Sequence, residues 1–333
     1  MIAWLVAGVL LTSVGLTGVL RRLALRLGFI DVPNERSSHQ TPKARGGGIA
    51  IVLASLAGWT VLLVIGRIPL DLFVALAGGG GAVAIIGLLD DYRSRPPSLR
   101  LAVHSVAAVW AVYWLGGMPA LQVGQGTYDL GIAGHVLAVI GILWVLNLFN
   151  FMDGIDGIAA IEAIFIALGG ALCSLLLTAA VLVPASLVLA AASAGFLVWN
   201  WPPARIFMGD AGSGFLGFVI AVVAIAAARS HPVAPFVWLV LGALFFVDAT
   251  VTLLRRMLRR ERLHQAHRSH AYQHQATRHG HLRVTVCWSL VNVGCLLPLA
   301  AAAAYYPKLA AALAGGLVVV LAALALHWRA GRA

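Results

Sequence analysis

Charge of either sign is scarce in this sequence, and negative charge is the scarcest. Only 11% of the 333 residues are Asp, Glu, Lys or Arg, and just 12 residues are acidic. Soluble globular domains carry about 25% charged residues, so the composition excludes an ordinary soluble fold. Hydrophobic residues make up 61% of the chain, and the mean hydropathy is +0.93. The sequence therefore predicts an all-α, polytopic integral membrane protein.

Cysteine is also rare, and all three cysteines (Cys173, Cys287 and Cys295) lie inside apolar runs. Their spacing indicates neither a disulfide framework nor a metal site, so we interpret them as small buried hydrophobic residues. The apolar runs are long enough to cross about 30 Å of hydrocarbon as helices. They predict eleven spans, at residues 2–20, 47–65, 70–89, 101–117, 134–151, 157–178, 181–199, 212–230, 234–254, 283–304 and 309–327.

Positive charge is distributed unevenly between the predicted loops. Twenty of the 23 Lys and Arg residues lie in residues 21–46, 90–100, 200–211, 255–283 and after 327. By the positive-inside rule these loops face the cytoplasm, which places the N-terminus outside and the C-terminus in the cytoplasm. The first run carries its positive charges after its apolar segment, so we expect a span there and not a cleaved signal peptide. The basic face is expected to meet anionic lipids or anionic substrates.

Ten of the 12 acidic residues belong to the same side as the basic loops or to the span ends that enter it. Loops are where charge costs least, and this explanation is sufficient for Asp31, Glu35 and Glu261. It does not explain the acids on or beside apolar runs, which are Asp90, Asp91, Asp153, Asp156, Asp210 and Asp248. Ionisable groups in such positions are costly and usually functional. Carboxylates at one membrane depth, facing cationic loops, indicate a divalent cation and phosphate groups.

Segment 147–157 places polar residues at a three-residue interval between two apolar runs: Asn147, Asn150, Asp153 and Asp156. On a helix, neighbours at this spacing share a face. Because Gly154 and Gly157 interrupt the pattern, we expect the fifth span to end near Asp153. Asp156 is expected to cap the next helix, whose free N–H groups favour anions. A tight turn alone would explain the two Asp-Gly pairs, but not the asparagines.

Two further segments bring carboxylates to predicted helix ends. Asp90 and Asp91 close the third span, although two acids at a helix C-terminus oppose its dipole. As neighbours they point in different directions and cannot duplicate one role. In segment 202–214, Asp210 is flanked by glycines whose backbone can approach a phosphate closely, and Arg205 supplies a cation.

The predicted loop at 255–283 holds eight Arg and six of the chain's 11 His. A polybasic patch on anionic lipid explains the arginines at its start, but it explains the histidines poorly. His267, Arg268 and His270 offer hydrogen-bond donors to an anion. The spacing of His267, His270 and His274 would also suit zinc, although Mg²⁺ fits the carboxylates better.

Taken together, these segments resemble the polyprenyl-phosphate N-acetylhexosamine-1-phosphate transferases, membrane enzymes that begin bacterial glycan assembly. The matching segments occur in order along nearly the whole chain: Pro33 to His39, Pro42, Arg45 to Gly48, Asp90-Asp91, Asn147 to Gly157, Arg205 to Gly217, Asp248 to Arg256 and His267 to Gln273. The resemblance implies one transmembrane catalytic domain over residues 1–333, in the bacterial inner membrane. Its active site would be formed by cytoplasmic loops at 21–46, 90–100, 150–157, 200–211 and 255–283.

The resemblance also implies a reaction and roles for the residues. Undecaprenyl phosphate would attack the β-phosphate of a UDP-N-acetylhexosamine, either UDP-GlcNAc or a 6-deoxy analogue, and release UMP with Mg²⁺ as cofactor and Mn²⁺ as a substitute. Asp210 is expected to be the principal metal ligand, with Asp91 beside it, while Asp90 and Asp91 align the lipid phosphate. The substrate-binding residues implied are Asn147, Asn150, Asp153 and Asp156 for the nucleotide, Arg205, His267, Arg268 and His270 for the diphosphate or sugar, and Lys43 and Arg45 as a cover.

Several alternatives remain open from the sequence. The last loop and the eleven spans resemble the branch that starts O-antigen or related envelope polysaccharides, and transfer of phospho-MurNAc-pentapeptide is the alternative within the family. A secondary transporter would place its polar residues near the bilayer midplane in two related halves. A lipid-binding scaffold would not need the acids beside the spans. No nucleic-acid partner is expected, and a homodimer is suggested by resemblance alone.

The chemistry of the lipid phosphate favours direct displacement over a covalent phospho-aspartate. A phosphate monoester has a second pKa of about 6, so it is already mostly dianionic at pH 7. A catalytic base at Asp90 would therefore have little proton left to remove.

Overall fold

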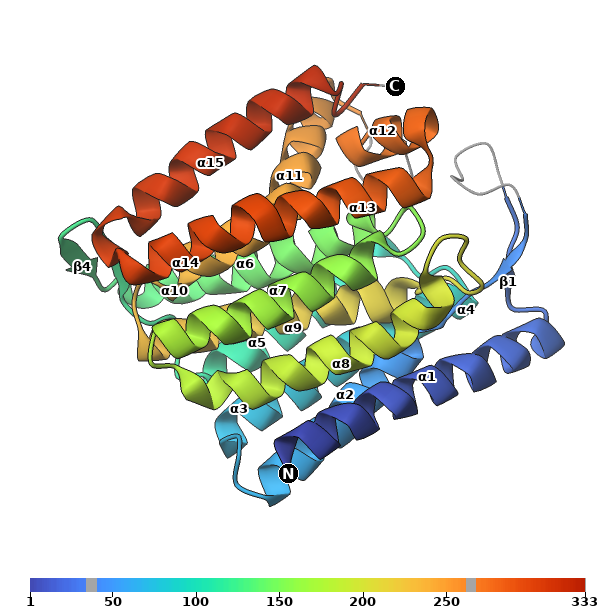
Figure 1. The fold of residues 1–333 in the computed structure, drawn as a ribbon, viewed down its shortest axis with the longest axis horizontal. Helices are drawn as coiled ribbons and strands as arrows, with labels where there is room; N and C mark the ends of the chain where they lie inside the picture. Colours follow the sequence, from blue (N-terminus) through green and yellow to red (C-terminus); the bar gives the residue numbers. More distant parts are fainter. Residues whose placement is uncertain (34–40, 262–267, 333) are drawn as a thin grey trace.

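The computed structural model describes residues 1–33, 41–261 and 268–332, and this part of the chain is almost entirely helical (Figure 1). The α-helices are α1 (Ile2–Leu27), α2 (Gly48–Val64), α3 (Leu70–Val74), α4 (Gly80–Tyr92), α5 (Pro97–Trp114), α6 (Gly131–Met152), α7 (Ile158–Leu176), α8 (Val183–Asn200), α9 (Asp210–Ser230), α10 (Ala234–Leu241), α11 (Ala243–Leu258), α12 (Ala271–His279), α13 (His281–Val291), α14 (Leu297–Tyr305) and α15 (Pro307–His327). Short π-helical or 3₁₀ segments are η1 (Ala75–Gly79), η2 (Ala180–Leu182) and η3 (Asn292–Leu296). Two antiparallel pairs complete the fold, β1 (Ile30–Asp31) with β2 (Lys43–Ala44) and β3 (Leu121–Val123) with β4 (Gly126–Tyr128).

The all-α, multi-pass architecture is confirmed. Among the described residues, eight helices are long and apolar enough to cross a membrane, or nine if the bent pair α10 and α11 counts as one span. Two of these spans are composite, because α3, η1 and α4 form one continuous helix and α13, η3 and α14 form another. Each of the eleven predicted runs falls in a helical segment, but α2 and α5 are not among the eight. The count of eleven and the orientation of the termini stay predictions.

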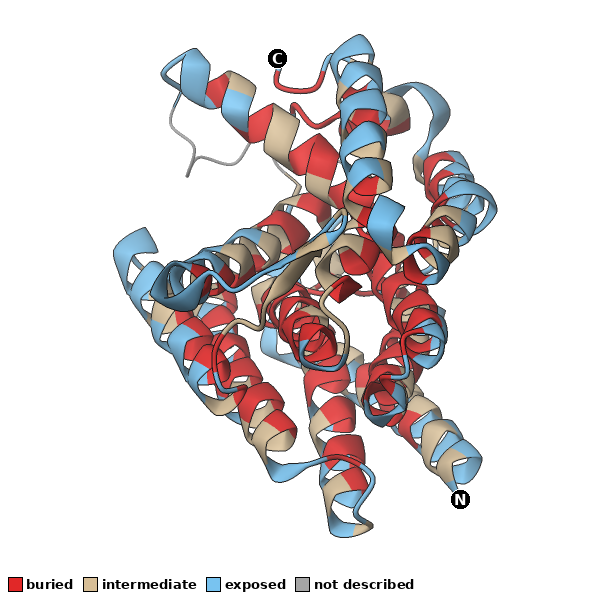
Figure 2. Ribbon diagram, turned by 90° about the vertical axis from the view of Figure 1, so that its left-hand side faces the viewer, coloured by how far each residue is buried: buried red, intermediate tan, exposed pale blue. Residues whose placement is uncertain are grey.

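Helix α9 lies at the centre of the bundle. Of its most apolar stretch 94% is buried, against 17% for α1 and for α15, and Figure 2 shows the buried residues concentrated on the inner helices. Glycines allow its neighbours to approach: a Cβ on Gly217 would meet the backbone of α6, and a Cβ on Gly87 would meet the first turn of α9. The central helix therefore begins in direct contact with the end of α4, where the paired aspartates lie.

The two ends of the bundle differ in structure. In Figure 1, α12, β1 and the C-terminus lie at one end, and the β3–β4 hairpin lies at the other. The bent pair α10 and α11 meets at an angle of 78°. Because of this bend, α11 leaves the direction of its neighbours and runs toward the end that carries α12 (Figure 1).

The prediction that all three cysteines are buried is wrong for two of them. Cys173 is buried, but Cys287 on α13 and Cys295 in η3 are exposed on the outside of the bundle. Lipid chains are as apolar as the protein interior, so hydrophobicity along a membrane helix does not separate lipid-facing from protein-facing positions.

Candidate active site

The end of α4 and the start of α9 form the first part of the site. Asp91 is buried, and its two carboxylate oxygens accept hydrogen bonds from the backbone N–H groups of Asp210 (2.9 Å) and Ala211 (3.2 Å). The first N–H groups of a helix have no partner within the helix, and an anionic side chain there is favourable. Asp91 thus caps α9 from another helix and fixes the position of the Asp210 side chain.

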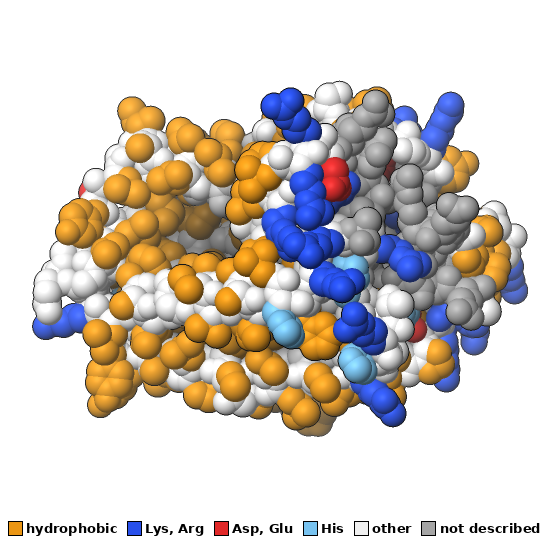
Figure 3. Space-filling model, turned by 90° about the horizontal axis from the view of Figure 1, so that it is seen from above, with side chains coloured by type: hydrophobic (Ala, Val, Ile, Leu, Met, Phe, Trp, Pro, Cys, Tyr) orange, Lys and Arg blue, Asp and Glu red, His pale blue; other side chains and the backbone are white. Residues whose placement is uncertain are grey.

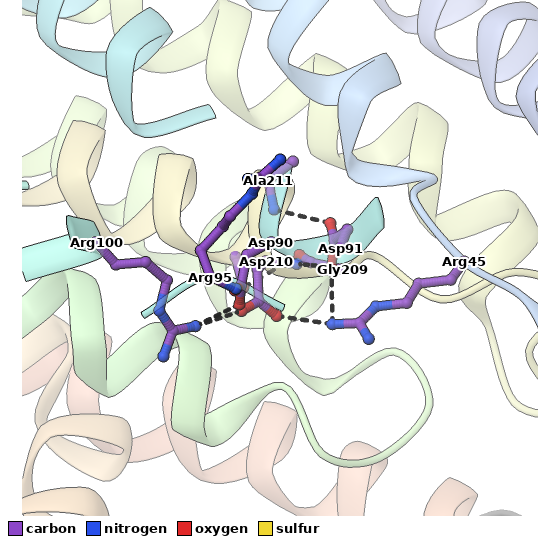
Figure 4. Close-up of polar contacts among 9 residues, drawn as sticks. Arg45, Asp90, Asp91, Arg95, Arg100, Gly209, Asp210 and Ala211 are labelled. Atoms are coloured by element: carbon purple, nitrogen blue, oxygen red, sulfur yellow. Dashed lines mark hydrogen bonds and ion pairs between the residues drawn. The ribbon is translucent and has the colours of Figure 1, made fainter. Parts of the chain in front are cut away.

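Two arginines bridge the three carboxylates of this part of the site (Figure 4). Arg45 Nη2 lies 2.7 Å from Asp91 Oδ1 and 2.9 Å from Asp210 Oδ1. On the opposite side, Arg100 Nη1 lies 2.5 Å from Asp90 Oδ2 and 3.1 Å from Asp210 Oδ2. Asp210 is therefore contacted by a guanidinium on each side, and each guanidinium is also held by one of the adjacent aspartates.

The adjacent aspartates have different partners, as their directions on a helix predict. Asp90 accepts a hydrogen bond from the backbone N–H of Arg95 (2.6 Å) as well as the contact from Arg100. It therefore holds the α4–α5 connection and orients Arg100. Asp91, by contrast, is bound to the backbone of α9. Both oxygens of Asp91 are engaged in this structure, so its predicted role as a metal ligand would require one of these bonds to give way, and that role stays a prediction.

A short main-chain ladder places Arg45 beside Asp210. The N–H of Phe207 donates to the carbonyl oxygen of Ala44 (2.8 Å), and the N–H of Gly48 donates to the carbonyl oxygen of Met208 (2.9 Å). A Cβ on Gly48 would meet the backbone of α9, so only glycine permits this approach. Two motifs that lie far apart in the sequence, residues 45–48 and 205–217, are thereby joined through backbone atoms.

A polar cavity of about 230 Å³ opens beside this cluster. Five of the residues predicted to form the site line it: Arg45, Asn150, Asp153, Asp156 and Asp210. Its other lining residues are Asp31, Gly154, Ile155, Asn200, Phe207, Met208, Gly209, Gln273 and His281. The cavity is thus bounded by four carboxyl groups, one guanidinium and several neutral donors and acceptors. Because the carboxyl groups outnumber the guanidinium, a phosphorylated ligand would bind there together with a divalent cation.

Asp156 is a structural centre of the cavity wall. It is buried, and its carboxylate accepts a hydrogen bond from the Ala204 N–H (2.9 Å) and lies 3.7 Å from Lys43 Nζ and 3.5 Å from His281 Nδ1. Burial opposes ionisation, but His281, the Ala204 N–H and Lys43 together lower the pKa of Asp156. The prediction that Asp156 caps the next helix is wrong: Gly157 precedes α7, and no side chain caps that helix.

Asp153 behaves in the opposite way. It follows the last residue of α6, as predicted, and is partly exposed to the cavity. Burial raises the pKa of Asp153 well above its usual value, and the nearby Asp210 adds to the effect. The cavity therefore contains one carboxyl group that favours the protonated form and can donate a hydrogen bond, beside Asp156, which favours the anion.

Helix α12 closes one side of the cavity through a second aspartate cap. The carboxylate oxygens of Asp248 on α11 accept hydrogen bonds from the N–H groups of Ala271 and Tyr272, both at 2.9 Å. Tyr272 donates to the carbonyl oxygen of Phe151 (3.1 Å), and the next residue, Gln273, lines the cavity. The arrangement mirrors the Asp91 cap on α9, so the starts of α9 and α12 are each held by a carboxylate from another helix.

Other predicted site residues lie outside the cavity wall. Asn147 donates to the Leu143 carbonyl oxygen in its own helix (2.7 Å), and Arg205 lies over the Trp199 ring, 5.9 Å from its centroid. His270 is buried beside Asp248, and Arg268 is exposed. Lys43 contacts the wall through Asp156 and lies over the ring of Phe207, and His267 lies outside the described residues. The substrate-binding roles of these six residues stay predictions.

The sequence reasoning missed Arg100, Asp31, Asn200, Gln273 and His281. The sequence places Arg100 among the charges that orient the loops, but its position next to an apolar run, in the first turn of α5, was an available signal. Asn200 bonds both the Gly157 N–H (3.0 Å) and the Ile206 carbonyl oxygen (2.9 Å), so it joins the ends of α7 and α8 to the site. Such contacts between distant segments leave no local sequence pattern.

The donor atoms of the site suit a hard divalent cation. Within the described part of the chain, no group of three or more His, Cys, Asp or Glu side chains is arranged to hold a metal ion by itself. Mg²⁺ usually needs only one or two carboxylates and takes its other ligands from water and substrate phosphates. Asp210 at the cavity edge would supply such a carboxylate once one of its contacts with Arg45 or Arg100 gives way.

The chain is similar in sequence to known proteins. A family model described as glycosyl transferase family 4 matches residues 73–228. The chain is 29% identical over 270 residues to the probable undecaprenyl-phosphate N-acetylglucosaminyl 1-phosphate transferase of Bacillus subtilis strain 168, with 79% of this chain and 74% of the relative covered.

Two further relatives differ in their described substrates. The decaprenyl-phosphate N-acetylglucosaminephosphotransferase of Mycobacterium tuberculosis is 31% identical over 232 residues, with 64% of this chain and 57% of the relative covered. The phospho-N-acetylmuramoyl-pentapeptide-transferase of Moorella thermoacetica is 32% identical over 204 residues, with 54% and 63% covered. In these two comparisons the aligned part of the chain spans less than two thirds of the relative's length.

Proposed function

This chain belongs to the polyprenyl-phosphate N-acetylhexosamine-1-phosphate transferases of glycosyl transferase family 4, and on that premise we propose that it transfers a HexNAc-1-phosphate from a UDP-N-acetyl sugar to undecaprenyl phosphate. A lipid phosphate oxygen forms a bond to the β-phosphorus of the nucleotide sugar. The bond from that phosphorus to the bridging oxygen breaks, and UMP leaves with the electron pair. The products are undecaprenyl-diphospho-sugar and UMP.

The observation that carries this proposal is the position of Asp210 between Arg45 and Arg100 at the edge of the polar cavity. Phosphoryl transfer is catalysed mainly by positioning and by neutralising charge. Both guanidiniums have more N–H donors than the carboxylates occupy. When phosphates enter, Arg45 and Arg100 turn these donors toward the phosphate oxygens, while Asp90 and Asp91 keep the two side chains from leaving the site.

A bound Mg²⁺, with Mn²⁺ as a substitute, would supply charge neutralisation at the diphosphate, held by Asp210 and substrate oxygens. The remaining work falls to residues of the chain. Asn150, Asp153 and Asp156 would bind the nucleotide: the Asn150 amide offers a donor and an acceptor, and the two carboxyl groups line the cavity beside it. Ala204 and Lys43 keep Asp156 in that position.

Asp90 acts by position and not as a base. Its two oxygens accept from the Arg95 N–H and from Arg100, and the lipid phosphate is already mostly dianionic at pH 7. We therefore expect Asp90→Asn to lower turnover about as much at pH 8 as at pH 6.5. Substantial recovery of turnover at pH 8 would contradict this and restore a general base.

The isoprenoid chain of the acceptor requires an apolar site, and the bundle contains one. A cavity of about 690 Å³ lies between α6, α9, the bent pair α10 and α11, and α15. Leu137, Ile142, Trp238, Phe246 and Leu254 are among the side chains that line it. This cavity supports a long-chain lipid as the acceptor. The bent pair α10 and α11 forms part of its wall.

We propose that the reaction starts O-antigen or a related envelope polysaccharide, at the cytoplasmic face of the inner membrane, with UDP-GlcNAc or a 6-deoxy analogue as donor. The Moorella relative supports the second candidate, transfer of phospho-MurNAc-pentapeptide. The two candidates differ in the size of the group that enters beside the nucleotide.

The proposal is tested by UMP release from purified protein in detergent or nanodiscs. UDP-GlcNAc, its 6-deoxy analogues and UDP-MurNAc-pentapeptide are each supplied with undecaprenyl phosphate, with Mg²⁺ or with EDTA. We expect release that depends on both lipid and Mg²⁺ and that occurs with a small amino sugar. Release only from the pentapeptide donor would select the second candidate. Absence of release from every donor, with substrate transport into vesicles instead, would select a transporter.

A further inference from the structure

A second feature at the same end of the bundle lies apart from the polar cavity. Arg255 Nη1 donates to the carbonyl oxygen of Ala330 (2.5 Å), and Arg259 Nη1 donates to that of Gly331 (2.9 Å). Arg332 follows directly, and Arg332 and Arg259 each lie within electrostatic reach of Arg255. Three guanidiniums thus meet where residues 329–332 pack on α11.

The charge of this cluster is retained in the described structure. The bonds of Arg255 and Arg259 go to neutral main-chain oxygens, and the acid of this segment, Glu261, pairs with Arg256 at 2.8 Å. A guanidinium has five N–H donors in a fixed arrangement, so donors remain on each side chain for an anion. The hydrogen bonds to main-chain oxygens hold these positive side chains close together, and an anion that binds between them reduces their repulsion.

An apolar cavity of about 230 Å³ lies between α11, α12, α13 and α15, and Ala330, in the segment that the arginines hold, packs against its lining residues Ala271 and Ala325. Its mouth includes Val291 and Leu324, both exposed, and Trp288 and Trp328 form part of its wall. The polar groups that reach it are already bonded: Asp248 to the start of α12, and Gln275 to the Trp288 indole N–H (2.9 Å). The cavity therefore suits a hydrocarbon chain.

In two segments of the chain, a residue that lines the cavity comes before the residues of the arginine cluster. Along α11, the lining residue Val247 precedes Arg255 by about two turns, and the lining residue Trp328, directly after the end of α15, precedes residues 329–332. Arg278 lies over the Trp328 ring, 5.9 Å from its centroid, which links the two parts. On the face of the molecule shown in Figure 3, a band of Lys, Arg and His side chains borders a hydrophobic surface.

We propose that this site binds one anionic phospholipid, with its headgroup phosphate on Arg255, Arg259 and Arg332 and an acyl chain in the cavity lined by Trp328. The ligand is a membrane lipid because the anion site and the hydrocarbon site adjoin at the edge of an apolar surface. Occupation of the site holds residues 329–332 against α11 and thereby supports α12, whose Gln273 lines the polar cavity. The proposal does not depend on the transferase reaction.

The test measures which lipid contacts Trp328. The protein is placed in nanodiscs of unbrominated phosphatidylcholine. Increasing fractions of a lipid with brominated acyl chains are then added, which is phosphatidylglycerol in one series and phosphatidylcholine in the other. Quenching of Trp328 is obtained as the difference between the native protein and Trp328→Phe, because the chain has 10 Trp residues. We expect brominated phosphatidylglycerol to quench Trp328 at a several-fold lower fraction than brominated phosphatidylcholine.

Variants separate a defined site from general attraction. Arg255→Gln with Arg259→Gln should raise the half-quenching fraction of phosphatidylglycerol by about fivefold for each arginine, since a basic residue near an anionic surface contributes about 1 kcal/mol. Val291→Phe, which fills the mouth and keeps every charge, should also weaken quenching. The control, Arg22→Gln with Arg26→Gln, makes the same charge change at exposed positions on α1 and should change it less than twofold. Equal quenching by both lipids, an equal effect of the control, or no effect of Val291→Phe would overturn the proposal.

Discussion

The two adjacent aspartates provide the sharpest test of the site, because replacing each with asparagine should have different consequences. Asp91→Asn keeps the volume of the side chain but replaces one carboxylate oxygen with an NH₂ group. Both oxygen positions face donors: Oδ1 accepts from the Asp210 N–H and faces Arg45, and Oδ2 accepts from the Ala211 N–H. One buried donor must therefore lose its partner, and α9 loses the negative charge at its N-terminus.

The size of the effect follows from these contacts. Hydrogen bonds to a charged group contribute about 1.5–3 kcal/mol each. The variant loses one such bond and weakens the others, so the free energy of unfolding should fall by about 3 kcal/mol. Asp90→Asn keeps an acceptor for the Arg95 N–H and loses mainly its ion pair with Arg100, in which the Arg100 side chain is 29% exposed. A partly exposed pair contributes about 1 kcal/mol or less.

The measurement is the denaturation midpoint of each purified variant in the same detergent, together with UMP release. We expect both variants to lose most of their activity, but only Asp91→Asn to unfold at clearly milder conditions. If Asp91→Asn were as stable as Asp90→Asn, the carboxylate would not be holding the start of α9, and its role would be limited to substrate or metal binding.

Three further predictions concern other parts of the molecule. Burial raises the pKa of Asp153 in the folded protein, whereas its pKa in the unfolded chain is about 4. The stability that this group contributes is fully present below the unfolded pKa and is lost as the pH rises through the folded pKa. The stability of Asp153→Asn relative to the native protein should therefore increase between pH 5 and pH 8, and a constant difference would contradict it. Glu162 is buried and accepts from an Asn292 amide (2.6 Å), while its other oxygen and that of the asparagine have no partner in the described structure; Glu162→Gln supplies a donor and should preserve stability in thermal unfolding, whereas Glu162→Ala should cost about 2 kcal/mol. Gly87→Ala places a Cβ 2.6 Å from a backbone nitrogen of α9 and should lower both stability and UMP release, whereas Gly81→Ala in the same helix meets nothing within 4 Å and should behave as the native protein.

The sequence was sufficient to predict the helical membrane fold and a set of polar residues that the structure brings together. Asn150, Asp153 and Asp156 line one cavity with Asp210, because a three-residue interval on a helix end and an acid at a helix start are local patterns. Such patterns say little about side-chain direction beyond the helix end. Asn147 belongs to the same interval, yet it bonds within its own helix and stays outside the cavity wall.

The hydrogen-bond partners of the carboxylates could not be predicted from the sequence. Asp156 was expected to cap the helix that follows it, but its oxygens turn to Ala204 on a segment almost fifty residues away. Asp91 and Asp248 do cap helices, yet the capped helices start far along the chain. Long-range caps depend on which helix ends lie side by side, and the packing of glycine-rich surfaces decides that.

The main-chain ladder between residues 44–48 and 206–208 has a consequence for how this pocket can change. Its bonds join N–H and carbonyl groups, so they do not depend on which side chains stand on them. A replacement of Phe207, whose ring faces Lys43, can reshape the pocket lining while Asp210 and Arg45 keep their positions. Under the proposed function, the preference for one nucleotide sugar over another can therefore change at this edge while the residues proposed to bind the phosphates stay in place.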